Sequence, residues 1–265
     1  MDLSQEGWQD HPSIIKCLGF SQVMCHVGLK FAKIIDFLRD YPSVCSVVGD
    51  NPTRRIEAEL RSTLKNYWRI GPPGVERYLG DDKTIKHAEI INYSDKNKII
   101  DTIIEDIDGL GYYEDLSQQF GIVSWELIMN GVFDAPWDHE QNKPKYAHLI
   151  HQDGFTLLPE EKVLISWGWD QDTMVVVVKD KWGRMTKKAL ENNIHRCLQK
   201  EDSQIRDEGG GAGLGLYMTF YQANQFDYQV DIDQATYAVG VIYPSKMRKK
   251  VISRFRSVNF FGGKK

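Results

Sequence analysis

The chain lacks the features that would place it in a membrane or in an oxidising compartment. Its 265 residues contain no apolar run near the roughly 18 residues that a membrane-spanning helix needs. The first residues, Met-Asp-Leu-Ser-Gln-Glu, are acidic, whereas a secretory leader begins with basic residues. The four cysteines form no Cys-x-x-Cys pair, so we expect reduced thiols rather than disulfides or a zinc site. We therefore expect a cytoplasmic protein with no membrane span.

Neither sign of charge dominates, and internal repeats are absent. The 33 Lys and Arg against 37 Asp and Glu give a net charge of −4, which offers no overall attraction to nucleic acid or to an anionic membrane. Hydrophobic residues make up 42% and charged residues 26%, as in ordinary globular proteins, and this excludes a disordered or fibrous chain. The length allows one large domain or two ordinary ones.

A cluster of prolines and glycines predicts the main boundary. Gly71-Pro-Pro-Gly74 and then Gly80-Asp-Asp-Lys83 interrupt both helix and strand. We expect a smaller α/β domain over residues 1–84, in which strands and helices alternate. Its expected strands are Ile14 to Phe20 and Val44 to Val48, and its expected helices are Val23 to Tyr41 and Thr53 to Asn66.

The sequence pattern of residues 85–245 predicts an α+β domain, in which helices pack against a mixed, largely antiparallel sheet. β-branched runs around turn residues predict two hairpins, and helical spacing of apolar residues predicts four helices. The expected strands are Ala88 to Tyr93, Val163 to Trp169, Thr173 to Lys179, Tyr228 to Asp233 and Thr236 to Tyr243; the expected helices are Asp95 to Ile107, Leu116 to Val132, Thr186 to Lys200 and Leu216 to Ala223.

The last twenty residues, 246–265, form a basic tail with interleaved aromatics. Eight Lys and Arg occur there with no acidic residue, among Phe255, Phe260 and Phe261. Such a segment suits nucleic acid, an anionic partner or lipid. The alternative is that the phenylalanines pack back onto the domain while the charges stay solvated, and this second interpretation is preferred.

Three separated stretches carry residues suited to chemistry. In the first, Glu126, Asn130 and Asp134 are four residues apart, so a helix would place them on one face amid apolar neighbours. An Asn oxygen suits Mg²⁺, and a carboxylate one turn away can orient or deprotonate a nucleophile. The same spacing also occurs on many exposed helix faces.

The second stretch is Asp180 at the end of a predicted buried strand, followed by Gly183. A carboxylate there can accept from an exocyclic amine such as that of adenine, although an Asp that starts a turn is the commoner case. The third stretch is a run of glycines over 209–215 directly before a helix, where the backbone can approach phosphates and the helix dipole favours them. A flexible joint is the alternative for the glycines alone.

Together, in this order, the three stretches resemble the GHKL ATP-binding superfamily of histidine kinases, gyrase-type and heat-shock ATPases, and anti-sigma-factor serine kinases. Glu126 to Asn130 with Asp134-Ala135 is similar to the N box, Asp180 with Gly183 to the first glycine box, and Gly211-Ala-Gly-Leu-Gly-Leu216 to the second. The resemblance implies a Bergerat-type α/β sandwich that binds Mg²⁺-ATP beneath a lid.

The resemblance also implies roles for individual residues. Asn130 would ligate Mg²⁺, Asp180 would recognise adenine, and Glu126 stands where superfamily ATPases and serine kinases keep their general base. The remaining nucleotide-binding candidates are Asp134, Gly183, Gly211, Gly213, Leu214 and Gly215. The lid would run from Thr186 to Glu208, with Arg184, Lys187, Lys188 and Arg206 within reach of the phosphates.

Two departures from the family pattern leave the function open. Trp182 stands where the first glycine of the first glycine box belongs, and no histidine carries an autophosphorylation motif. The leading hypothesis is a kinase that phosphorylates serine or threonine of a partner, in a sigma-factor pathway or other signalling system. The alternatives are a non-catalytic, nucleotide-dependent regulator and a kinase acting on a histidine in trans. A homodimer is compatible with each.

Overall fold

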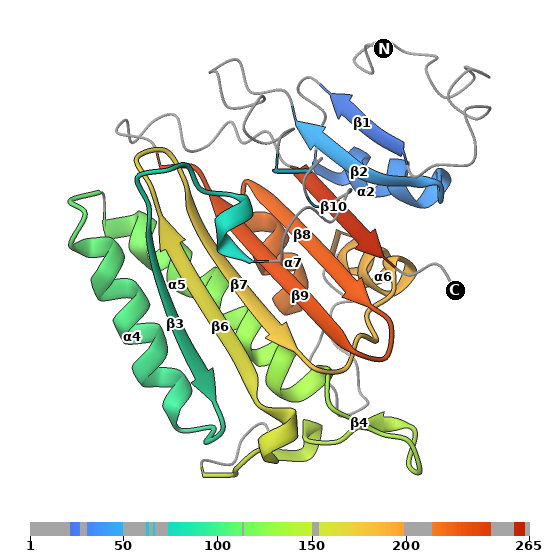
Figure 1. Ribbon diagram of the computed structural model, residues 1–265. Coiled ribbons are helices and arrows are strands. Elements are labelled where there is room, and N and C mark those ends of the chain that lie inside the picture. Colours follow the sequence, from blue (N-terminus) through green and yellow to red (C-terminus); the bar gives the residue numbers. More distant parts are fainter. Residues whose placement is uncertain are drawn as a thin grey trace.

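Eight strands form one mixed sheet, and helices cover one of its faces (Figure 1). The computed structural model describes residues 22–26, 31–49, 62–63, 66, 74–112, 114–149, 154–198, 214–244 and 257–262. The sheet order is β1-β2-β10-β8-β9-β7-β6-β3. The strands are β1 (Gln22–His26), β2 (Val44–Gly49), β3 (Thr84–Ile90), β6 (Val163–Trp169), β7 (Met174–Asp180), β8 (Gln225–Asp231), β9 (Ala235–Ile242) and β10 (Ser257–Gly262).

Neighbouring strands are antiparallel except at two places. β1 pairs with β2 in parallel, and β10 pairs with β8 in parallel. β10 also pairs antiparallel with β2, so it joins the N-terminal strands to the rest of the sheet. The predicted α+β class with a mixed, helix-covered sheet is therefore confirmed, whereas a separate domain over 1–84 stays a prediction.

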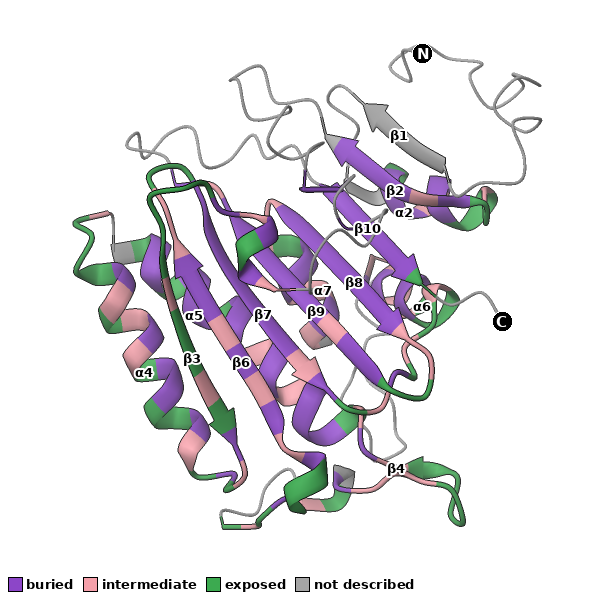
Figure 2. Cartoon of the chain, viewed as in Figure 1, coloured by how far each residue is buried: buried purple, intermediate pink, exposed green. Residues whose placement is uncertain are grey.

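The helices lie together behind the sheet in Figure 1. They are α2 (Phe31–Asp40), α4 (Asp95–Asp108), α5 (Glu114–Met129), α6 (Lys187–Leu198) and α7 (Leu214–Gln222). Figure 2 shows that the strands at the centre of the sheet are largely buried. Gly240 of β9 allows α5 to approach closely, because a Cβ atom there would overlap Val123. No helix among the described residues combines the length and the apolar character needed to span a bilayer.

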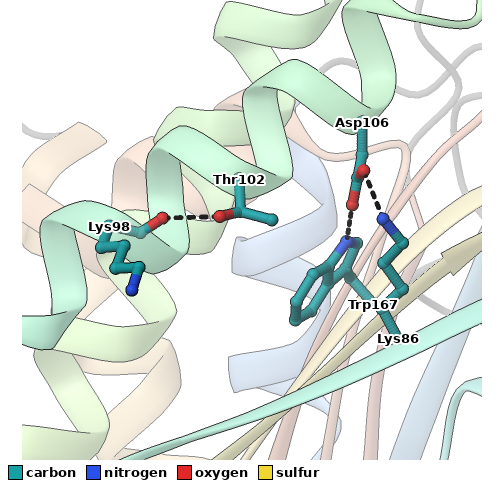
Figure 3. A network of polar contacts seen from close by, with 5 residues as sticks. All are labelled: Lys86, Lys98, Thr102, Asp106 and Trp167. Atoms are coloured by element: carbon teal, nitrogen blue, oxygen red, sulfur yellow. Dashed lines mark hydrogen bonds and ion pairs between the residues drawn. The ribbon is translucent and has the colours of Figure 1, made fainter.

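A polar network fastens α4 to the edge of the sheet (Figure 3). Asp106 on α4 accepts hydrogen bonds from Lys86 Nζ on β3 at 2.6 Å and from Trp167 Nε1 on β6 at 2.9 Å. The two donors come from neighbouring strands, since Lys86 lies opposite Trp167 in the ladder. One carboxylate thus connects three elements at the outer end of the helical layer.

A second buried network lies on the opposite face of the sheet. Asp227 on β8 is almost wholly buried and accepts hydrogen bonds from Tyr78 Oη at 2.9 Å, Gln225 Nε2 at 2.8 Å and Asn259 Nδ2 at 2.6 Å. Burial raises the pKa of Asp227 to about 7, against the opposing effect of these donors. The network connects the segment before β3 to β8 and β10.

The N-terminal prediction of one helix over Val23 to Tyr41 is wrong in its first part. Gln22–His26 is strand β1, and the helix begins at Phe31. The residues of β1 pair along the whole of β2, and such pairing overrides a local helical pattern. The predicted strand Ile14 to Phe20 lies outside the described residues, as does the predicted helix Thr53 to Asn66 apart from residues 62, 63 and 66.

The C-terminal phenylalanines pack back onto the domain, as the preferred interpretation of the tail expected. β10 lies between β2 and β8, inside the sheet. Phe260 and Phe261 are each only 6% exposed. Phe255 and the basic residues of the tail lie outside the described residues, so their partners stay a prediction.

Candidate functional site

The end of α5 carries the first group of candidate residues. The predicted helix to Val132 is wrong at its end, because α5 stops at Met129 and Asn130–Asp134 form a π-helical turn. The amide of Ala135 donates to the carbonyl of Asn130 at 2.9 Å and closes this wider turn. Gly131 lets the turn press on the sheet, since a Cβ atom there would lie 3.2 Å from Val163 and 3.3 Å from Val178. Such turns often occur at functional sites.

The start of α7 lies directly against this end of α5. A Cβ atom on Gly215 would overlap Glu126 Oε2 and would lie 3.9 Å from Asn130 Oδ1. Only a residue without a side chain allows this approach while Glu126 keeps its position. The structure thus brings Gly215, at the end of the glycine run, to Glu126 and Asn130, which are far from it in the sequence. The amide groups at the start of a helix favour negative charge at this position.

Asp180 is at the end of β7, on the face of the sheet that the helices cover. It lies opposite Thr236 on β9 and is 7% exposed. Burial raises its pKa to about 6, although the hydrogen bond from the amide of Trp182 (2.8 Å) and the nearby polar groups of Thr236 and Gly183 work in the opposite direction. The carboxylate is thus held in a fixed position. Thr236, its neighbour across the ladder, was not predicted from the sequence as part of this region.

Tyr228 on β8 is influenced by the charge of Asp180 and by that of Asp134 in the π-turn. Its pKa is raised by burial first, and then by the negative charges of Asp180 and Asp134. Both carboxylates therefore influence the same phenol electrostatically. Tyr228 was not predicted from the sequence, because an aromatic residue in a strand usually packs in the core.

The carboxylates of the site also influence one another. Burial raises the pKa of Glu126, and the charge of nearby Asp134 raises it further. Asp134 has an exposed surface, yet desolvation of its carboxyl group by the surrounding protein raises its pKa to about 6. A carboxylate with a raised pKa is a stronger base near neutral pH than an ordinary one.

Gly183 takes a conformation that favours glycine. Its φ is +60°, and a Cβ atom there would overlap the carbonyl oxygen of Asp231 and lie 2.8 Å from the amide nitrogens of Asp233 and Gln234. Gly183 therefore lets the chain after β7 pass close to the backbone of the turn between β8 and β9, and its role as a substitute for the glycine missing at Trp182 stays a prediction. Within the described part of the chain, the buried indole nitrogen of Trp182 has no hydrogen-bond partner.

The region predicted as a lid begins with a packed helix. Thr186 caps α6 by accepting from the amide of Ala189 at 3.1 Å, and Leu190 and Ile194 are buried. Lys187 donates to the carbonyl oxygen of Leu38 at 2.9 Å and pairs with Glu191 at 2.6 Å. The packing therefore directs Lys187 toward α2. Residues 199–208 of the predicted lid, Arg206 among them, lie outside the described residues.

Asn130 retains capacity for a ligand. Its Nδ2 atom is buried and finds no hydrogen-bond partner among the residues that the structure describes. A buried N–H group without a partner is costly, so its presence at this point calls for a hydrogen-bond acceptor nearby. The described residues hold no cluster of three or more His, Cys, Asp or Glu that could bind a metal alone. An Asn with phosphate oxygens from a nucleotide is a donor set that Mg²⁺ accepts.

Three of the predicted binding residues are described only in part or not at all. Gly211 and Gly213 lie outside the described residues. Leu214 is the first residue of α7, and its side chain is likewise not described. Of the glycine run over 209–215, the structure therefore describes only the end, at Leu214 and Gly215.

Comparison with known proteins leaves the family open. No family model matches the chain, and no curated protein matches it in sequence. A chain in the crystal structure of the SiaB-SiaC complex from Pseudomonas aeruginosa is similar with a TM-score of 0.40 and 13% identity, over 60% of this chain and 88% of that one. A similarity of this size identifies neither a family nor an activity.

Proposed function

We propose that the chain is a GHKL-type protein that binds Mg²⁺-ATP between the end of α5, the start of α7 and the end of β7. The observation that carries the proposal is the approach of Gly215 to Glu126 and Asn130, which places a helix start beside an Asn and a carboxylate. This approach, between residues far apart in sequence, supports a shared site for the stretches that resemble the N box and the second glycine box. The electrostatic influence of both Asp134 and Asp180 on Tyr228 supports the inclusion of Asp180.

The start of α7, Asp180 and Asn130 each have a role in the proposed binding of Mg²⁺-ATP. The amides at the start of α7 would hold phosphate oxygens, and Asp180 would accept from the adenine amine. Asn130 Oδ1 would hold Mg²⁺, whose charge offsets that of the phosphates when it is bound.

We propose further that the bound ATP is used to phosphorylate serine or threonine of a partner signalling protein. Glu126 is close to the helix start and has a raised pKa, so it would accept the proton of the attacking hydroxyl. A kinase acting on histidine would leave Glu126 without this task.

A second candidate function is a nucleotide-dependent regulator without transferase activity. It is favoured by Trp182, whose bulky side chain replaces a glycine of the family pattern beside Asp180. Transfer of the γ-phosphoryl group of ATP to a hydroxyl acceptor separates the two candidates, because a passive binder would transfer none.

Mg²⁺-ATP is expected to raise the melting temperature of the purified chain by several degrees at concentrations far above its Kd. Ligand at a hundredfold excess over Kd stabilises the folded state by about 2.7 kcal/mol. Asn130→Ala should reduce this shift in the presence of Mg²⁺, because it removes the metal ligand. Absence of any shift with every adenine nucleotide would contradict ATP binding.

A further inference from the structure

An arginine and a tryptophan are stacked beside the proposed nucleotide site. The guanidinium carbon of Arg184 lies 3.9 Å from the centre of the Trp137 ring. Trp137 begins strand β4 (Trp137–Asp138), three residues after Asp134. Arg184 directly follows Gly183. The stack therefore joins the chain just after the π-turn to the chain just after β7.

Its surroundings place this stack near the carboxylates. Gly183, just before Arg184, lies against the backbone of the turn between β8 and β9, and Asp180 lies opposite Thr236 just after this turn. Asp233, in the turn between β8 and β9, acts electrostatically on Arg184. The guanidinium thus lies near Trp137 and the acidic turn, and both are at the end of the sheet that carries Asp180.

The charge of the site creates a need for a cation. Glu126, Asp134 and Asp180 would all oppose a triphosphate when ionised. Two nearby lysines are directed elsewhere: Lys187 binds the carbonyl oxygen of Leu38 and Glu191, and Lys179 lies over the ring of Tyr237 at 5.0 Å. Lys179 and Tyr237 face each other across β7 and β9, on the face of the sheet away from the helices.

We propose that Arg184, positioned by its stack on Trp137, binds phosphate oxygens of the nucleotide. The inference rests on the proposed function and adds a phosphate-binding residue to that site. Stacking occupies the face of a guanidinium and leaves its in-plane N–H groups available, and these match phosphate geometry. Within the described residues, no acceptor takes a hydrogen bond from the Arg184 side chain. Trp137 thus acts as a positioning residue for Arg184.

The test is calorimetric titration of the full chain with Mg²⁺-ATP, at low and at high potassium chloride. Arg184→Gln is expected to weaken binding about tenfold or more, the range for loss of a hydrogen bond from a charged group. Arg184→Lys should lose less affinity, because it keeps the positive charge. Some loss should remain, because lysine lacks the planar guanidinium group. Trp137→Ala should weaken binding in the same direction through loss of positioning. Lys181→Gln, the matched control, removes an exposed neighbouring charge and should bind nearly as the wild type does.

The salt dependence distinguishes phosphate contact from a structural role. Wild-type affinity should fall more steeply with salt than that of Arg184→Gln, because the variant has lost one charge contact. Equal affinity of wild type and Arg184→Gln would overturn the proposal, and so would an equal loss in Lys181→Gln. An unchanged salt dependence in a weakened Arg184→Gln would overturn it as well. Failure of the wild-type chain to bind Mg²⁺-ATP would instead overturn the proposed function, and this inference with it.

Discussion

Replacement of Glu126 by glutamine is expected to lower turnover of the γ-phosphate of ATP by about 10²- to 10⁴-fold, the usual contribution of a general base. Glutamine keeps the shape of the side chain against Gly215 but accepts no proton. Binding of Mg²⁺-ATP should be unaffected, since Asn130, Asp180 and the start of α7 remain. The measurement is release of labelled phosphate from ATP, with water as the acceptor hydroxyl, beside the melting shift produced by the nucleotide.

The pH dependence provides the control for this role. Glu126 accepts a proton only when it is ionised, so turnover should fall as the pH drops through its raised pKa. Asp134→Asn removes the neighbouring negative charge, which lowers the pKa of Glu126, and the acid limb of the profile should therefore move to lower pH. Wild-type turnover that persists in Glu126→Gln would assign the base to another group, and loss of ATP binding in that variant would indicate a structural role.

Replacement of Gly183 by alanine is expected to lower the free energy of unfolding by about 3 kcal/mol or more, in the range of severe backbone effects. The added Cβ would overlap the carbonyl oxygen of Asp231, and its other close neighbours are also backbone atoms. Relief therefore requires movement of the turn between β8 and β9. Because Gly183 follows Asp180 closely in the chain, movement at this point should lower the affinity for ATP as well.

Gly111→Ala is the matched control for this prediction. Gly111 has a similar φ of +72°, yet nothing lies within 4 Å of an added Cβ. Gly111→Ala should lower the free energy of unfolding only by the penalty of the left-handed conformation, about 1–2 kcal/mol. Urea unfolding of both variants measures the difference. Similar losses in the two variants would show that the contact with the β8–β9 turn has no role.

Elements specified by local chemistry were predictable from the sequence. The turn between β6 and β7 is an example, because Asp170 Oδ1 accepts from the amides of Asp172 and Thr173, both at 2.8 Å. The β-branched run of β7 indicated a strand with the same directness. Thr186 indicated the start of α6 through its capping hydroxyl.

Elements that depend on distant partners were not predictable. β10 has a basic flank and a central polar residue, Asn259, which is the pattern of an exposed tail. Its place in the sheet depends on Asp227, which is 32 residues away and accepts from Asn259 Nδ2 at 2.6 Å. β1 likewise needs the ladder of β2, and no local signal separated it from the helix that follows.

The residues of the candidate site likewise fall into those with a local sequence signal and those that depend on distant partners. Glu126, Asn130 and the glycines were found through their spacing, and the structure brings Gly215 to the end of α5. Their roles stay predictions. Trp137 and Tyr228 were not predicted, because their surroundings depend on the fold: Trp137 stacks on Arg184, and Tyr228 is influenced by the charges of Asp134 and Asp180.

The most direct measurement of the central claim is a crystal structure of the chain with Mg²⁺ and a non-hydrolysable ATP analogue. The account predicts phosphates at the start of α7, the metal ion on Asn130 Oδ1, and the adenine amine on Asp180. A nucleotide bound at another surface, or one whose phosphates lie away from Gly215 and Asn130, would contradict it.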